Sequence, residues 1–178
     1  MSKTALKKAI KELDPEQLRE LILDIYEAKC DSRYYLDFFV NPDINTRLEA
    51  AKAAIGKELR RGSRGISKAR ISVVKKAIAS ITCLQPGPEE CVEIMKYGVV
   101  SLCLTAHVFS FKEGLVKSTA KLLNDTLVYA DRNQLLGSCL TTIERAINEL
   151  PSPFYRRSTL KQALKAQFQT TLDSLATL

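Results

Sequence analysis

The chain has 178 residues, with 27 lysines and arginines, 20 aspartates and glutamates, and one histidine. Its length, its hydrophobic content of 46% and its charged content of 26% are those of a globular domain that needs no disulfide or metal to support its core. The opening MSKTALKKAIKEL is unlike a signal peptide, and the most apolar window, residues 97–111, is shorter than a membrane span. We therefore expect a single cytoplasmic domain over residues 1–178 that does not enter a membrane.

The cysteine pattern argues against both a disulfide framework and a zinc site. The cysteines are odd in number, widely scattered, and never arranged as C-x-x-C. Because free cysteine is among the most buried residue types, we expect all of them to pack in the core in a reducing compartment. They are Cys30, Cys83, Cys91, Cys103 and Cys139.

Apolar residues recur at helical spacing from the beginning of the chain. Residues 3–13 form the first predicted helix, with Ser2 as its cap. Asp14, Pro15 and Gln17 are typical of a helix start with a capping box, and they predict a second helix over residues 15–29. An aromatic-rich segment over residues 32–40 should end at Asn41-Pro42, because the residue before a proline is disfavoured in a helix.

Further helix starts follow from caps and breakers along the rest of the chain. The helix after the proline-rich break at residues 84–88 is the most apolar, runs to about Phe109, and should lie at the centre of the structure. The predicted starts are Asp43, Ser67, Pro88, Ser110, Asp131 and Ser152. No stretch alternates at a period of two for long enough to predict a strand.

These features predict an all-α fold, a compact array of about seven to eight antiparallel helices. The turns between the helices are very short, which favours antiparallel neighbours. A HEAT-like stack of helix pairs and a closed bundle both remain open, because no residue-level repeat appears at a fixed period.

The net charge of +7 is concentrated in one segment, Lys57–Lys76. Eight basic residues and one acid, Glu58, lie there, so the segment itself carries +7. Taking these nine residues away leaves 19 basic and 19 acidic residues, and the rest of the chain is therefore neutral.

The same segment combines a loop with two glycines, residues 62–65, and the helix start predicted at Ser67. Free backbone N–H groups and the helix dipole favour an anion at such a place. The alternative is a solvated face, or basic residues paired with acids such as Asp37 or Asp43. The candidate anion-binding or partner-binding residues are Arg60, Arg61, Ser63, Arg64, Ser67, Lys68, Arg70 and Lys75.

Other candidate chemistry is sparse, and we predict no catalytic residue, metal site or cofactor. His107 is the single histidine and should be a buried, hydrogen-bonded residue in the middle of a helix. Glu89, Glu90 and Glu93 lie in a first helical turn, where the dipole accounts for them without a metal. The aromatic cluster favours core packing over base stacking, because its spacing is helical. The cluster consists of Tyr34, Tyr35, Phe38 and Phe39.

Three stretches resemble a family of small all-helical bacterial proteins labelled only as a domain of unknown function. They are residues 2–7 (SKTALK), residues 35–42 (YLDFFVNP) and residues 68–78 (KARIS running on to KKAI). The resemblance covers the N-terminal half of the chain. It implies a helical fold in the bacterial cytoplasm and no particular activity, cofactor or catalytic residue.

The leading functional hypothesis is a non-enzymatic helical module whose basic loop and helix start bind an acidic partner, either nucleic acid or an acidic protein. The alternative is an enzyme or accessory subunit that holds a phosphorylated small molecule at the Ser67 helix start. A third possibility is a scaffold with an apolar groove for a partner helix. The sequence does not predict an oligomeric state.

Overall fold

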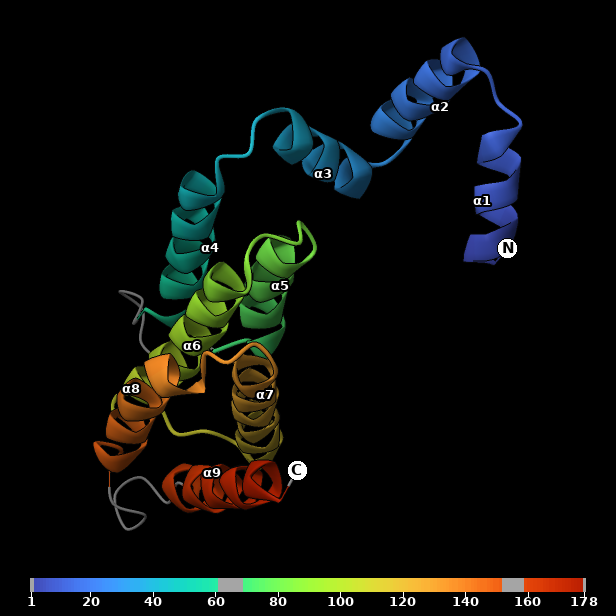
Figure 1. Ribbon diagram of the computed structural model, residues 1–178. Coiled ribbons are helices and arrows are strands. Elements are labelled where there is room, and N and C mark those ends of the chain that lie inside the picture. Colours follow the sequence, from blue (N-terminus) through green and yellow to red (C-terminus); the bar gives the residue numbers. More distant parts are fainter. Residues whose placement is uncertain (1, 61–68, 152–158, 178) are drawn as a thin grey trace. The chain divides into compact units, whose positions relative to one another are not determined.

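The computed structural model describes residues 2–60, 69–151 and 159–177 (Figure 1). Over these residues the protein is all-α, with nine helices and no strand, so the predicted fold class is confirmed. The helices are α1 (Lys3–Lys11), α2 (Pro15–Ala28), α3 (Cys30–Val40), α4 (Ile44–Leu59), α5 (Ile71–Thr82), α6 (Pro88–Thr105), α7 (Glu113–Arg132), α8 (Leu136–Asn148) and α9 (Leu160–Ala176).

The chain divides into two compact units, Met1–Ile44 and Asn45–Leu178. We call them the N-terminal unit and the C-terminal unit and describe each by itself. The single domain expected over residues 1–178 stays a prediction.

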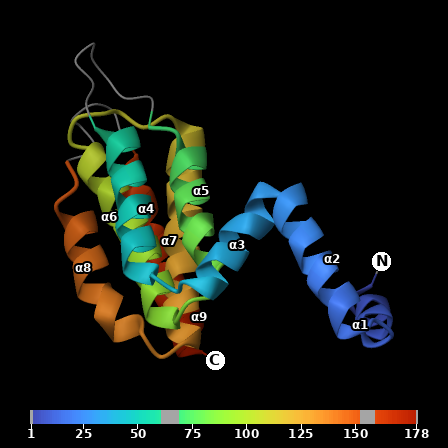
Figure 2. The ribbon, with the colours of Figure 1, turned by 90° about the horizontal axis from the view of Figure 1, so that it is seen from above.

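The C-terminal unit is a bundle of antiparallel helices built around α6 and α7. Helix α6 packs against α5, α7 and α8, while α7 also packs against α5, α8 and α9. Figure 2 shows α5, α6 and α7 side by side with their axes nearly aligned. Half of the 18 residues of α6 are buried, as expected for the most apolar helix at the centre of the fold.

One hydrophobic core joins the helices of this unit. The large side chains that are almost wholly buried come from α4, α5, α6, α7, α8 and α9 alike. Buried threonines are also satisfied, because the hydroxyls of Thr105, Thr119, Thr126 and Thr171 each donate to the carbonyl four residues earlier. The core residues buried most completely are Ile55, Val74, Ile81, Ile94, Val99, Leu102, Thr119, Leu123, Leu127, Ile143, Leu160 and Leu164.

The N-terminal unit contains α1, α2 and α3, and α2 packs against α3. The hydroxyl of Tyr26 donates to Asp37 at 3.0 Å, and the guanidinium of Arg33 lies 5.2 Å from the centre of the Tyr26 ring. The predicted start of α2 is confirmed, because Asp14 and Gln17 form a reciprocal capping box.

The aromatic cluster of α3 is only partly packed. Tyr34 and Phe38 are half-buried, but Tyr35 is exposed and 75% of Phe39 is exposed. Core packing was therefore the wrong expectation for Tyr35 and Phe39. Within its unit, helix α3 packs on α2.

The predicted helix starts agree with the structure to within a few residues at Ser110 and less well at Asp131. Asp131 belongs to the last turn of α7, because the buried stripe of that helix continues to Ala130. Helix α7 begins at Glu113 with Lys112 as its N-cap, three residues after Ser110. Two predicted caps, Ser67 and Ser152, lie outside the residues that the structure describes, and the helices that follow them begin only at Ile71 and Leu160.

His107 also differs from its prediction. Helix α6 ends at Thr105, and His107 lies exposed in the turn that follows. Its backbone N–H bonds to the carbonyl of Leu104, three residues earlier, which marks a tightened last turn. The histidine therefore lies past the buried part of α6.

The cysteines follow the core prediction in part. Cys91, Cys103 and Cys139 are buried free thiols, and burial raises the pKa of Cys103 to about 12. Cys83 is exposed just after the last residue of α5, which corrects the prediction for that residue. The side chain of Cys30 lies outside those that the structure describes.

Candidate functional sites

The basic segment Lys57–Lys76 joins α4 to α5, and the structure describes its two ends. Of the eight candidate residues, three lie in described parts: Arg60 directly after α4, Arg70 directly before α5, and Lys75 within α5. The other five lie outside the described residues. They are Arg61, Ser63, Arg64, Ser67 and Lys68.

Four cations at the described ends of the segment point to solvent. Lys57 lies in the last turn of α4, Arg60 follows it, and Lys75 and Lys76 lie on α5, and all four side chains are exposed. None of the four forms a salt bridge with an acid in residues 2–60, 69–151 or 159–177. We call these four residues the free cations of the basic segment.

Arg70 behaves differently, because it is paired with Glu58 of α4. The carboxylate of Glu58 accepts hydrogen bonds from the backbone N–H, Nε and Nη2 of Arg70 at 2.9, 3.0 and 2.8 Å. The hydrogen bond from the Arg70 guanidinium lowers the pKa of Glu58 against the opposing effect of burial, and the same bond raises the pKa of Arg70. Internal pairing therefore holds for Arg70, and its partner is Glu58 rather than Asp37 or Asp43.

This pair changes what the start of α5 can bind. Arg70 is the N-cap of α5, and its backbone N–H already bonds to a carboxylate of the protein itself. A negative charge at this position also complements the helix dipole. Glu58 thus accepts the hydrogen bonds of Arg70 next to the start of α5, while Ser67, where the anion site was predicted, lies outside the described residues.

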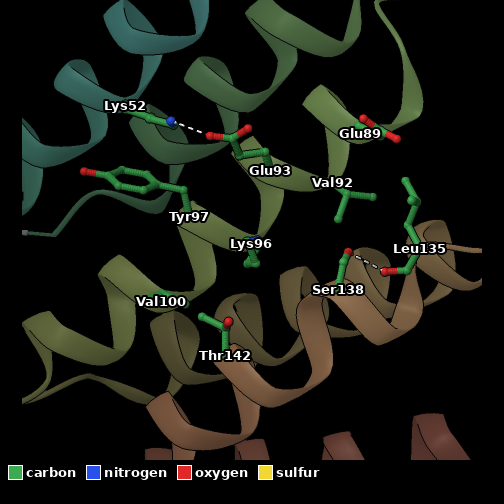
Figure 3. Close-up of a pocket in the computed structure, with 10 residues that line it drawn as sticks. All are labelled: Lys52, Glu89, Val92, Glu93, Lys96, Tyr97, Val100, Leu135, Ser138 and Thr142. Atoms are coloured by element: carbon green, nitrogen blue, oxygen red, sulfur yellow. Dashed lines mark hydrogen bonds and ion pairs between the residues drawn. The ribbon is translucent and has the colours of Figure 1, made fainter.

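A second candidate site is a cavity of about 430 Å³ between α4, α6 and α8 (Figure 3). The sequence did not lead us to predict it, although the polar Lys96 and Tyr97 within the most apolar helix were a signal. Its lining mixes apolar walls with charged and hydroxyl groups. The residues that line it are Lys52, Glu89, Val92, Glu93, Lys96, Tyr97, Val100, Leu135, Ser138 and Thr142.

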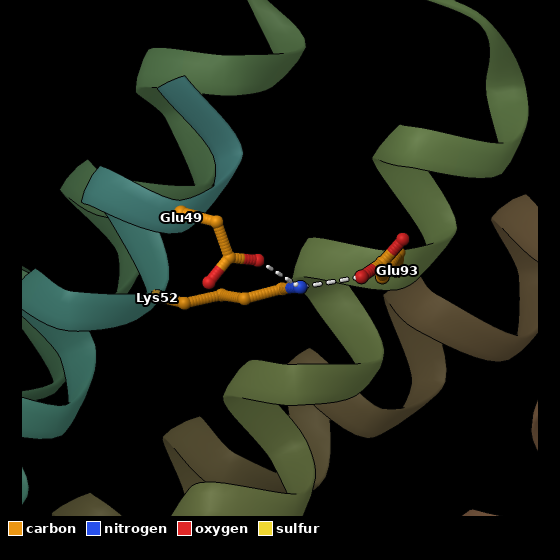
Figure 4. A network of polar contacts seen from close by, with 3 residues as sticks. All are labelled: Glu49, Lys52 and Glu93. Atoms are coloured by element: carbon orange, nitrogen blue, oxygen red, sulfur yellow. Dashed lines mark hydrogen bonds and ion pairs between the residues drawn. The ribbon is translucent and has the colours of Figure 1, made fainter. Parts of the chain in front are cut away.

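One of the two lysines in the cavity, Lys52, forms ion pairs with two glutamates. The Nζ of Lys52 lies 2.8 Å from Oε1 of Glu49 and 2.5 Å from Oε1 of Glu93, so one cation bridges α4 and α6 (Figure 4). The hydrogen bonds to Glu49 and Glu93 raise the pKa of Lys52, which keeps it charged. Lys52 therefore holds two helices together and contributes little positive charge to the cavity.

Three other polar groups of the cavity are uncommitted. Lys96, the hydroxyl of Tyr97 and the hydroxyl of Thr142 form no hydrogen bond or ion pair with any part of the chain that the structure describes. All three can donate, and Lys96 also carries a positive charge. In Figure 3 the ring of Tyr97 points away from Lys96 and Thr142. Lys96 and the hydroxyl of Thr142 suit a small anion, and apolar lining residues such as Val100 suit an apolar part of it.

The described residues contain neither a metal-ligand cluster nor a membrane-spanning helix. No three histidine, cysteine, aspartate or glutamate side chains in these ranges are grouped as they would be around a metal ion. None of the helices there combines the length and the apolar character that crossing a bilayer requires.

Comparison with known proteins gives a family. No curated protein and no solved structure matches the chain. The sequence matches the "Family of unknown function (DUF6155)" over residues 1–149. The match extends to the end of α8, so confining the family resemblance to the N-terminal half was wrong. The protein belongs to this family.

Proposed function

We propose that the protein is a non-enzymatic helical binding module whose basic segment, Lys57–Lys76, binds an acidic partner. The partner would be nucleic acid or an acidic protein surface. The observation that carries this proposal is the group of free cations, Lys57, Arg60, Lys75 and Lys76, which are exposed and unpaired with acids in the described structure. They lie in the one segment that holds the whole excess of positive charge.

The physical support is that these positive charges belong to one segment of the chain and are not paired with acids in the described residues. Binding a polyanion neutralises these charges and releases counterions from the partner, so the free energy of binding depends on salt. The Glu58–Arg70 pair contributes differently, because it ties the end of α4 to the start of α5. The free cations lie on the two helices that this pair joins.

A binding titration against salt tests the proposal. The ligands are single-stranded DNA, duplex DNA and polyglutamate, which represent nucleic acids and an acidic protein surface. The test variant carries Lys57→Glu, Arg60→Glu, Lys75→Glu and Lys76→Glu. On duplex DNA we expect the slope of log K against log salt to fall by about one unit for each phosphate that the variant no longer neutralises. The ligand whose affinity falls most steeply identifies the class of partner.

A matched control reverses four exposed cations elsewhere in the C-terminal unit. These are Lys112→Glu, Lys121→Glu, Arg145→Glu and Lys165→Glu, again three lysines and one arginine. The control should keep wild-type affinity within a few fold. An equal fall in affinity for the two variants would mean that net charge alone drives binding, and wild-type affinity in the test variant would reject the site.

The cavity favours a second candidate function, an accessory subunit or enzyme that holds a small phosphorylated or carboxylated molecule. Its place would be beside Lys96 in this cavity, whereas the Ser67 helix start predicted for such a ligand lies outside the described residues. A saturable rise of the melting temperature with a panel of small anions, abolished in Lys96→Met and kept in Lys165→Met, would support it. A rise that survives Lys96→Met would place the ligand elsewhere.

A further inference from the structure

The charged side chains at the cavity between α4, α6 and α8 do not balance. Lys52 and Lys96 supply two positive charges. Glu89 and Glu93 in the lining, together with Glu49, which bonds to Lys52, supply three negative charges. All five residues belong to the C-terminal unit. The site therefore has a surplus of one negative charge, although one of its lysines has no acid partner among the described residues.

The surplus negative charge lies beside α4. Lys52 bonds to Glu49 and Glu93 at the same time, but one ammonium group can neutralise only one of the two carboxylates (Figure 4). Both of these bonds use Oε1 of the glutamate. The other oxygen of Glu93, Oε2, accepts no hydrogen bond from any residue that the structure describes. It is able to accept one from a positively charged donor.

The positive charge of Lys96 lies toward α8. Lys96 follows Glu93 by one turn of α6, but the two side chains form no ion pair. Burial raises the pKa of the Cys139 thiol in α8, and the positive charge of Lys96 opposes this rise, which requires the ammonium to be near α8. In Figure 3 the lining residues of α6 lie between Lys52 of α4 and Thr142 of α8. An available acid and an available cation thus lie toward two different walls of one cavity.

Apolar side chains form another part of the lining. Val92 and Val100 come from α6, and Leu135 lies directly before α8. A volume of about 430 Å³ suits a small molecule. A phosphate group brings up to about two negative charges, which Lys96 alone cannot balance in a site that already has surplus negative charge. A simple carboxylate would pair with Lys96 but would leave the surplus acid without a counter-charge.

We infer that the cavity binds a small zwitterion, an amino acid with an apolar side chain. Its carboxylate pairs with Lys96 and accepts from the hydroxyl of Thr142, while its ammonium donates to Oε2 of Glu93. Each charged end of the ligand then meets the opposite charge, and the apolar side chain meets the valines and the leucine. This inference rests on the second candidate function, in which the cavity is a ligand site, and it specifies the chemical class of the ligand.

Calorimetric titration of the full chain with alanine, valine, leucine, methionine and phenylalanine, each up to about 10 mM, tests the inference. At least one of them should bind saturably. The amino acid that binds most tightly is then compared with its two truncated analogues, which for leucine are 4-methylpentanoate and 3-methylbutylamine. Each analogue lacks one charged end and should bind about tenfold more weakly, because one charge-assisted contact is lost.

Two variants distinguish the two ends of the ligand. Lys96→Met should weaken both the amino acid and its carboxylic acid analogue by about tenfold, because it removes the partner of the carboxylate. Glu93→Gln should weaken the amino acid by about tenfold and leave the carboxylic acid analogue no weaker, because it removes the partner of the ammonium. The matched controls, Lys165→Met and Glu144→Gln, change exposed charges of the same unit and should keep wild-type affinities.

The comparison of analogues on the wild type needs no variant, and circular dichroism at 222 nm shows whether each variant is folded. Absence of binding by every amino acid in the panel overturns the inference. Equal affinity for the amino acid and the carboxylic acid analogue, with both lost in Lys96→Met, also overturns it but leaves the second candidate function standing. Amino acid binding that survives both Lys96→Met and Glu93→Gln places the ligand elsewhere and overturns both.

Discussion

The carboxylate of Glu58 is the single acid among the eight bases of Lys57–Lys76, and only 10% of its side chain is exposed. A carboxylate so well covered is stable only where donors surround it, and here one residue, Arg70, supplies three. Arg70 itself is 65% exposed. If the pair is broken, water can therefore hydrate the exposed guanidinium of Arg70 more readily than the covered carboxylate of Glu58.

Replacing Glu58 by alanine should lower the free energy of unfolding by about 1–3 kcal/mol, because it removes charge-assisted hydrogen bonds at a helix junction. Glu49→Ala is the matched control. Glu49 also bonds to a lysine, but it is 71% exposed, and surface pairs contribute at most about 1 kcal/mol. Urea unfolding of the two variants measures the difference. Equal destabilisation would show that the Glu58 hydrogen bonds have no special role in stability.

The same carboxylate should make stability depend on pH. The hydrogen bond from Arg70 holds the pKa of Glu58 below its usual range in the folded state. Its stabilising contribution is therefore complete above the unfolded pKa, about 4.3, and is lost as the pH falls through the lower folded pKa. Glu58→Gln cannot titrate at this position. Urea unfolding at pH 7 and at about pH 3 should show the gap between wild type and Glu58→Gln narrowing in acid, whereas a constant gap would contradict the assignment.

For His107, in contrast to Glu58, we predict a substitution with little effect on stability. Because it is exposed in the turn after α6, His107→Ala should change the free energy of unfolding by less than about 0.5 kcal/mol. Thermal or urea unfolding measures this directly. A decrease of about 2 kcal/mol would restore the interpretation of His107 as a buried core residue.

At the scale of helices, the capping and helix-breaking residues predicted which helices exist better than they predicted where each helix begins and ends. The capping box at Asp14 and the break at Asn41-Pro42 are where the sequence places them, because each acts through the backbone of its own turn. The cap expected at Asp131 was wrong because the buried stripe of α7 runs on to Ala130, and tertiary packing outweighs a cap. Such packing is not visible in a short window of sequence.

The contact between α5 and α6 depends on one glycine. A Cβ at Gly98 would lie 3.0 Å from Cδ1 of Ile78 and 3.3 Å from Cγ1 of Val74. Gly98→Val adds two further methyl groups at this contact and should lower the free energy of unfolding by about 1–3 kcal/mol. Gly137→Val is the control, since nothing lies within 4 Å of a Cβ there. Equal stability of the two variants in urea unfolding would mean that α5 and α6 accommodate the larger side chain with no loss of free energy of unfolding.

At the scale of the whole molecule, the fold class and the place of the charge were predictable from the sequence. Helical periodicity and net charge are properties of the chain itself, so they do not depend on which helices meet. The cavity was not predictable in this way, because Lys96 and Thr142 come together only through the packing of α6 and α8. The exposure of Leu6 and Ile10 was not predictable either, because the helical spacing of an apolar stripe is the same whether the stripe is buried or exposed.

Chemical footprinting of lysines on the unmodified protein tests the proposed binding surface most directly. The protein is acetylated briefly with and without the polyanion that it binds most tightly in the salt titration, and each lysine is quantified by mass spectrometry. Lys57, Lys75 and Lys76 should be protected several fold by the ligand, while the equally exposed Lys121 and Lys165 should react as before. Protection spread evenly over all exposed lysines, or confined to Lys121 and Lys165, would contradict the assignment of binding to the basic segment.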